Sequence, residues 1–398
     1  MVIEHVRRTA SLSLAILATL TACTGPPGSE AQSTATSASN ASVAPTSVEP
    51  TASISLEPVQ RFDLGKREAW PFALTPTGVL APVTSIGGAS AEQVWLLDLA
   101  TGGQSVVART EWPGGAIGGV AAAGQWAVWV DMKRVQTDSP PWGVLWKIWA
   151  KNLATDQQIL LDTNGTATDV SFSASAPRLI SGDGYVGWAK PGDDGFVRQL
   201  VWRAGWASPR TLSLQLQGFI GASAIADGKL IFRLLSDVEW RLDRGLGDCW
   251  SSPIDGSEAP QSLTHSGLVR GCTMTGTDLV WTEHIDPKTN RKALVSKAGD
   301  YPYKLMTLSL TDPSAPRAIH QGIMQMGPPI VGTDFTWWVP FGAPVISSLT
   351  SPAQVAVKGA NRDFIRVVAA DGQLVAYQLR TKSQRTIISV ARVVSSSP

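Results

Sequence analysis

Three long polar segments, residues 131–143, 236–248 and 283–302, contain the side chains best suited to hold a ligand. Arginine guanidinium groups grip carboxylates or phosphates in a forked geometry, and tryptophan rings stack on sugars or anchor protein partners. The residues of these two types are Arg134, Trp142, Trp240, Arg241 and Arg244. We expect the segments to form a binding face; the alternative is that they are solvated loops of variable sequence.

Acidic residues and histidines offer few combinations that could perform catalysis. Glu283 and His284 are neighbours, but adjacent residues of a strand point to opposite faces. We therefore assign them to the binding face and not to a catalytic dyad. Asp193 and Asp194 could hold a cation, although a hairpin turn explains residues 190–195 better. No metal site and no cofactor are predicted.

Sequence signatures of enzymes are missing from the chain. There is no G-x-S-x-G nucleophile turn, no H-E-x-x-H pair and no glycine-rich phosphate loop. Two carboxylates that flank a glycosidic bond would come from distant strands. A pair of this kind leaves no contiguous motif, so an enzyme acting on glycans is the alternative function. It requires two carboxylates about 5–10 Å apart.

A recurring phrase indicates the elements that position these residues. A turn glycine is followed by an apolar run that usually ends in a large residue, and the intervals between copies are 46, 60, 44, 48, 56 and 40 residues. Each period has room for about four short strands, and no segment of 60–398 has the periodicity of an amphipathic helix. Repeated four-strand units are typical of a β-propeller. The copies begin at Gly78, Gly124, Gly184, Gly228, Gly276, Gly332 and Gly372.

The phrases Asp227-Gly228 before an apolar run and Asp98-Leu-Ala-Thr-Gly102 resemble those of TolB-like and WD-type propellers. We predict an all-β propeller over 59–398, with seven blades of four antiparallel strands. Six blades is the alternative, because the 332–372 interval is short. The strand over 59–64 is expected to complete the last blade and so join the two ends of the domain. In such a fold the long segments lie on the face opposite the tight glycine turns.

The N-terminus has the features of an export signal. Arg7 and Arg8 precede the apolar stretch 10–20, which is too short to span a bilayer. It ends in Leu20-Thr21-Ala22-Cys23, which resembles the lipobox of bacterial lipoproteins. The resemblance implies removal of residues 1–22 and a diacylglycerol on Cys23, at the extracytoplasmic face of the bacterial cell membrane. The alternative is an ordinary signal peptide with a chance cysteine.

The segment after Cys23 is expected to be a disordered linker that reaches residue 58. Of the 30 residues from Thr24 to Ser53, 24 are Ser, Thr, Ala, Pro or Gly. Such a composition buries too little apolar surface to offset chain entropy.

If Cys23 carries lipid, Cys249 and Cys272 remain as an even pair in an oxidising compartment. We predict a disulfide between them; two buried free thiols are the alternative.

Composition limits the partners. The formal net charge is +1, which gives no basic field for nucleic acid. Most of the sixteen tryptophans fall in the repeated strands, where they are expected to pack between blades. We therefore expect a lipid-anchored monomer whose propeller binds an envelope protein or a cell-wall polymer without catalysis. A purely structural spacer is a third hypothesis.

Overall fold

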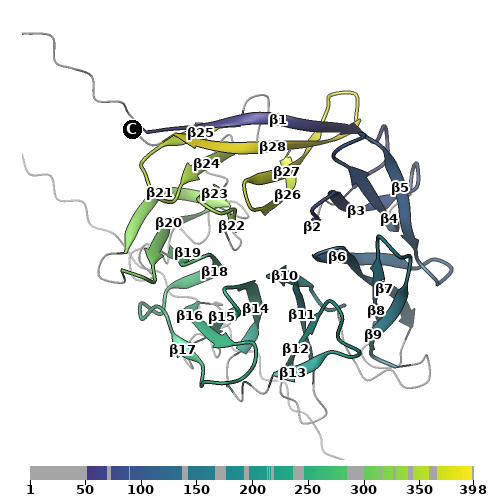
Figure 1. The fold of residues 1–398 in the computed structure, drawn as a ribbon, viewed down its shortest axis with the longest axis horizontal. Coiled ribbons are helices and arrows are strands. Elements are labelled where there is room, and N and C mark those ends of the chain that lie inside the picture. Colours follow the sequence, from purple (N-terminus) through teal and green to yellow (C-terminus); the bar gives the residue numbers. More distant parts are fainter. Residues whose placement is uncertain are drawn as a thin grey trace, which may run out of the picture. The chain divides into compact units, whose positions relative to one another are not determined.

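Every regular element of the described residues is a β-strand (Figure 1). The computed structural model describes residues 52–69, 73–88, 90–136, 142–165, 176–191, 197–212, 214, 216, 219–235, 246–284, 300–312, 316–325, 329–338, 344–357 and 365–396. All of them belong to one compact unit, residues 49–398. The predicted signal peptide 1–22, Cys23 and the linker up to residue 51 lie outside the described residues. No helix in the described part is long and apolar enough to cross a membrane.

Five sheets each contain four antiparallel strands. The first three are formed by β2 (Ala73–Leu74), β3 (Gly78–Thr84), β4 (Ala91–Asp98) and β5 (Gln104–Arg109); by β6 (Ala116–Ala123), β7 (Trp126–Gln136), β8 (Trp142–Asn152) and β9 (Gln158–Thr163); and by β10 (Ile180–Gly182), β11 (Tyr185–Pro191), β12 (Val197–Arg203) and β13 (Arg210–Leu212). The other two are formed by β22 (Ile330–Val331), β23 (Phe335–Trp338), β24 (Val345–Ser348) and β25 (Gln354–Ala356); and by β26 (Ile365–Asp371), β27 (Leu374–Arg380), β28 (Thr386–Ser396) and β1 (Ser53–Asp63).

A sixth, eight-stranded sheet lies between the third of these sheets and the one that begins with β22. A single residue pair, Gly247 with Val269, joins its two halves. Gly247 also lies close to the preceding strand of its own half, because a Cβ there would lie 1.9 Å from the carbonyl oxygen of Leu234. Its strands are β14 (Phe219–Ala226), β15 (Lys229–Leu235), β16 (Gly247–Pro253), β17 (Gln261–Ser262), β18 (Val269–Thr275), β19 (Asp278–His284), β20 (Asp300–Ser309) and β21 (Arg317–Gln325).

The sheets of this unit have a propeller arrangement. Figure 1 shows β2, β6, β10, β14, β18, β22 and β26 around a common centre, each as the innermost strand of its set. The all-β propeller-like fold predicted from the repeat is confirmed. The number of separate four-stranded sheets is five, which differs from the predicted seven and from the alternative of six, because the Gly247–Val269 pair merges two sets into one sheet.

The two ends of the domain meet in one sheet, as predicted. The N-terminal strand β1 pairs with β28 in antiparallel register from Ser53–Ser396 to Asp63–Ile387. It begins at Ser53, inside the segment 23–58 that was expected to be linker. The reason is the alternation of exposed serine and buried apolar residues: Ile54 is buried although serines flank it on both sides. A bulge between Pro58 and Gln60 interrupts the pairing and twists this edge strand.

The core lies between neighbouring sheets. One cluster joins the β6–β9 sheet to the β10–β13 sheet through Trp146, Trp188 and Trp202, all of which are fully buried. Five tryptophans predicted to pack between blades are likewise buried: Trp129, Trp188, Trp281, Trp337 and Trp338. Large flat rings supply the apolar area that these short strands need to pack face to face.

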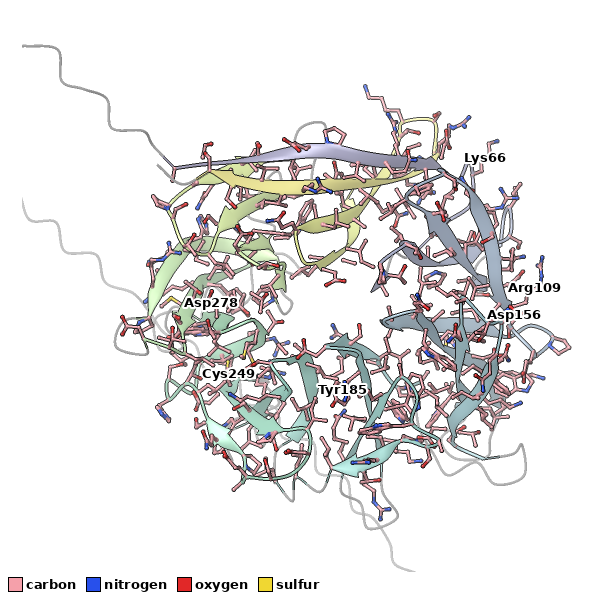
Figure 2. The ribbon with its side chains drawn as sticks, viewed as in Figure 1. Lys66, Arg109, Asp156, Tyr185, Cys249 and Asp278 are labelled. Carbon is pink, nitrogen blue, oxygen red and sulfur yellow. The ribbon has the colours of Figure 1, made fainter. Side chains whose placement is uncertain are left out.

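The predicted disulfide is wrong. Cys249 on β16 and Cys272 on β18 are both buried in one cluster, and both are free thiols. Figure 2 labels Cys249. The Cys272 thiol donates a hydrogen bond to the carbonyl oxygen of Phe232 at 3.5 Å. Burial and the neighbouring Cys272 thiol raise the pKa of Cys249 well above its ordinary value.

Candidate functional site

A cavity of about 630 Å³ lies where the innermost strands meet. Its walls are the ends of β2, β6, β10, β14, β18, β22 and β26 together with the tight turns that follow most of them. Most lining residues are alanine, glycine, serine, threonine or aliphatic residues, so backbone groups and small side chains form the surface. The titratable groups among the lining residues are Arg178, Asp183 and Asp371.

Asp-Gly turns position two of the walls. Asp183 and Gly184 have φ of 52° and 75°, and Asp227 and Gly228 have φ of 51° and 64°. Two consecutive positive φ angles define the hairpin turn whose twist matches that of its strands, and Asp-Gly is among the preferred sequences for it. The Asp183 carboxylate also accepts a hydrogen bond from the backbone N–H of Gly228 at 3.0 Å. Neighbouring turns around the cavity are therefore tied to each other.

Close backbone contact makes this part of the wall rigid. A Cβ on Gly182 would lie 1.8 Å from the carbonyl oxygen of Ile225, so β10 and β14 approach as only glycine allows. Desolvation by the surrounding protein raises the pKa of Asp371, the other carboxylate of the cavity. A hydrogen bond from the Gly372 backbone N–H acts in the opposite direction. Arg178 is exposed and is the one cation among the lining residues.

The cavity is on the side of the tight glycine turns, whereas the sequence pointed to the opposite loops. The signal that could have found it is the recurring Asp-Gly phrase, which marks the turns themselves. Among the expected binding residues, Arg134 is exposed on β7, and Trp142 is the first residue of β8. The register pairs Arg134 with Val144 and Trp142 with Gln136. Arg134 and Trp142 therefore belong to the same end of the β7–β8 hairpin. Four other predicted site residues lie outside the described residues: Asp194, Trp240, Arg241 and Arg244.

Glu283 and His284 are not brought together. The Glu283 carboxylate accepts a hydrogen bond from the indole N–H of Trp281, two residues earlier on the same face of β19, at 3.0 Å. His284 is buried, and its ring contacts that of Tyr303 edge-to-face at 5.5 Å between centroids. The alternation of the strand thus gives the two residues separate, structural surroundings.

A polar cluster around Lys147 on β8 was not predicted from the sequence. The Lys147 ammonium lies 2.7 Å from a carboxylate oxygen of Glu111. It also lies 5.3 Å and 5.6 Å from the ring centroids of Trp112 and Trp149. Nothing local in the sequence pairs Trp112 with Lys147.

Asp131 on β7, the cross-strand partner of Lys147, is also part of this cluster. It is fully buried and accepts hydrogen bonds from the Thr110 hydroxyl at 2.6 Å and from the Glu111 backbone N–H at 2.8 Å. Desolvation raises its pKa, against the effect of these hydrogen bonds. The Lys147–Glu111 ion pair and the hydrogen bonds to Asp131 together fasten the β5–β6 connection to the β6–β9 sheet.

A groove of about 690 Å³ lies between the outer strands β1 and β25. Leu56, Val59, Val355 and Val357 form its apolar wall, and Arg61 and Tyr377 add polar groups. Among the described residues, no group of three or more His, Cys, Asp or Glu side chains is placed to hold a metal ion.

No protein-family model and no curated protein matches this sequence. Solved structures with a similar arrangement include TolB from Acinetobacter baumannii, at 11% identity and a TM-score of 0.39 over 83% of this chain and 66% of that one. PorZ, a surface component of the type-IX secretion system of Porphyromonas gingivalis, is similar at 10% identity and a TM-score of 0.48, over 88% of this chain and 39% of PorZ. A puromycin-hydrolyzing peptidase of Mycobacterium tuberculosis is similar at 13% identity and a TM-score of 0.44, over 78% of this chain and 50% of the peptidase. The chain thus spans less than two thirds of the length of each of these three proteins.

Proposed function

We propose that this protein is a lipid-anchored extracytoplasmic lipoprotein whose propeller is a non-catalytic binding or scaffold module. Its partner is an envelope protein or a cell-wall polymer. The observation that carries the proposal is the central cavity of about 630 Å³, to which every innermost strand contributes. Rigid turns and small side chains form a surface suited to shape recognition and backbone hydrogen bonding. Its two carboxylates, Asp183 and Asp371, come from sheets that are not adjacent along the chain.

The proposed architecture has seven blades. The merged sheet counts as two blades, β14–β17 and β18–β21, because only Gly247 and Val269 pair across them. With the five separate sheets this makes seven sets of four strands. A rigid ring of this kind supports binding because the tight turns that line the cavity keep fixed positions without ligand.

The proposed anchor is a diacylglycerol on Cys23, supported by the sequence Leu20-Thr21-Ala22-Cys23 after an apolar stretch. Replacing Cys23 by alanine should move the protein from the detergent phase to the aqueous phase of a phase-partition experiment on whole cells. Retention of Cys23→Ala in the detergent phase would reject the lipid anchor and leave the binding function to be tested separately.

A pull-down from detergent-solubilised envelope tests the binding function and its location. Ser181→Trp places a large ring at the exposed cavity wall, and Ser105→Trp adds the same ring to an exposed position on β5 outside the cavity. We expect Ser181→Trp to abolish capture of the partner and Ser105→Trp to preserve it. A triple alanine variant of Trp142, Trp240 and Arg241 tests the loop face. If only that variant loses the partner, binding is at the loops; if the full protein captures nothing, the binding function is wrong.

A further inference from the structure

Four side chains form a ladder on the third sheet, at the side of the tight turns. Tyr185 begins β11, Arg203 ends β12, Trp206 lies in the β12–β13 turn, and Arg210 begins β13. We call these four residues the arginine–aromatic ladder. Figure 2 labels Tyr185 on β11, the second strand of this sheet.

Ring and guanidinium contacts hold the ladder together. The Arg203 Cζ lies 5.3 Å from the centroid of the Tyr185 ring, and the Arg210 Cζ lies 4.1 Å from that of Trp206. The two rings meet edge-to-face, with centroids 5.8 Å apart and an interplanar angle of 82°. Arginine over an aromatic face is held by the attraction between cation and π electrons.

The backbone fixes these positions. Tyr185 is the direct cross-strand partner of Arg203, and Arg210 pairs with Val201. The Trp206 backbone N–H donates to the carbonyl oxygen of Arg203 at 3.0 Å. The indole N–H of buried Trp202 donates to the carbonyl oxygen of Trp206 at 3.0 Å. The turn that carries Trp206 is thus tied to the core, so the ladder is formed before any ligand arrives.

Both arginines are exposed, and no described acidic residue forms an ion pair with either of them. A guanidinium that uses its face on an aromatic ring retains N–H donors on its edge, in the forked geometry that fits phosphate and carboxylate. Two such forks on neighbouring strands suit a ligand with more than one oxyanion. The chain as a whole has a net charge of +1, so this local pair of cations is not part of a general positive field.

The ladder also leads away from the central cavity. Gly184, which lines the cavity, directly precedes Tyr185, and β11, β12 and β13 follow one another outward from β10 in the sheet. A chain-like ligand could therefore extend from the cavity to the outer strand. We propose that the arginine–aromatic ladder binds an extended carbohydrate or polyol polymer that carries phosphate or carboxylate groups. The inference rests on the proposed binding function and narrows its partner to an anionic cell-wall polymer.

The test uses the full-length protein in detergent and measures its binding to immobilised polymers. Poly(glycerol phosphate) presents phosphate, polygalacturonate presents carboxylate, and dextran is the neutral reference. We expect binding to one or both anionic polymers, weakened by added salt, and no binding to dextran. The variant Arg203→Ala/Arg210→Ala should lower the affinity about tenfold or more, the loss expected for charge-assisted hydrogen bonds. Arg203→Lys/Arg210→Lys keeps both charges but not the forked geometry. Its affinity should lie between that of the original protein and that of the double alanine variant.

The matched control is Arg109→Ala/Arg392→Ala, which removes two exposed arginines from β5 and β28 and should keep the affinity of the original protein. Arg109 is labelled in Figure 2 on a different sheet from Tyr185. Equal losses in the two alanine variants would show non-specific charge attraction and overturn the inference. So would binding to phosphatidylglycerol vesicles in place of the polymers, or no binding to either anionic polymer. If the envelope pull-down still captures a protein in that last case, the binding function stands and only the polymer is rejected.

Discussion

The carboxylate of Asp63 and the guanidinium of Arg385 form a forked ion pair between residues 322 positions apart in the sequence. Arg385 Nη2 lies 2.6 Å from Asp63 Oδ2, and Arg385 Nε lies 3.1 Å from the same oxygen. The pair fastens the end of β1 to the start of β28, where the two ends of the domain join. The hydrogen bond from Arg385 is the main cause of the lowered pKa of Asp63. Both side chains are well exposed, so water and salt screen the attraction.

The first prediction is that apolar packing, and not this ion pair, holds the ring closed. Phe62 is 1% exposed and packs in the cluster that contains Leu74, Ile388 and Val390. Phe62→Ala should lower the free energy of unfolding by about 3–5 kcal/mol. Arg385→Ala should have a much smaller effect that disappears in high salt. Urea unfolding of both variants at low and high salt checks this; a larger loss in Arg385→Ala would contradict it.

The second prediction concerns the pH dependence caused by Asp131. Because burial raises its pKa in the folded state, the folded protein binds this proton more tightly than the unfolded chain does. The contribution of Asp131 to stability is therefore greatest at pH values below its ordinary pKa of 3.8, and it falls as the pH rises through the raised value. Asp131→Asn does not titrate, and its amide can accept from Glu111 and donate to Thr110.

We therefore expect the stability of Asp131→Asn relative to the original protein to increase as the pH rises through this acid range. Urea unfolding of the two proteins at a series of acidic pH values measures the difference. A constant difference would show that the pKa of Asp131 is not raised. Asp131→Ala, which leaves the Glu111 N–H without its acceptor, should cost about 1–3 kcal/mol.

The third prediction is that Cys249 and Cys272 are protected by burial and not by a covalent bond. Both thiols are free, and burial raises the pKa of Cys249. A thiol reagent should leave both unmodified in the native protein and should label both in denaturant without reductant. Mass spectrometry of the labelled peptides gives the result. If neither cysteine is labelled in denaturant until a reductant is added, the two cysteines form a disulfide and this prediction is wrong.

The fourth prediction concerns the contact between the third sheet and its neighbour. A Cβ on Gly182 would overlap the carbonyl oxygen of Ile225, so Gly182→Ala must push β10 away from β14. The expected loss of unfolding free energy is about 1–3 kcal/mol. Gly119→Ala, on the innermost strand β6, is the matched control because nothing lies within 4 Å of its Cβ position and its φ is not positive. Equal thermal stability of the two variants would mean that the close contact is absent.

The sequence by itself determined the features that depend on short-range rules. Strand content follows from the alternation of apolar and polar residues, and the turns at Gly184 and Gly228 follow from Asp-Gly sequences that accept positive φ. The glycine-based period correctly placed the strand that follows each turn glycine, namely β3, β7, β11, β15, β19, β23 and β27. The strand expected over 59–64 correctly predicted the pairing of β1 with β28.

Only the tertiary structure decided which side chains meet. Cys249 and Cys272 lie in one cluster as free thiols, the Gly247–Val269 pair merges two strand sets, and the cavity opens among the tight turns. The arginine–aromatic ladder went unnoticed in the sequence because Tyr185, Arg203 and Arg210 are ordinary residues of three different strands. Their contacts depend on the strand register, which places Tyr185 opposite Arg203, and on the turn at Trp206 that joins β12 to β13. Local propensity specifies strands and turns, whereas the relative placement of side chains comes from the packing of sheets against each other.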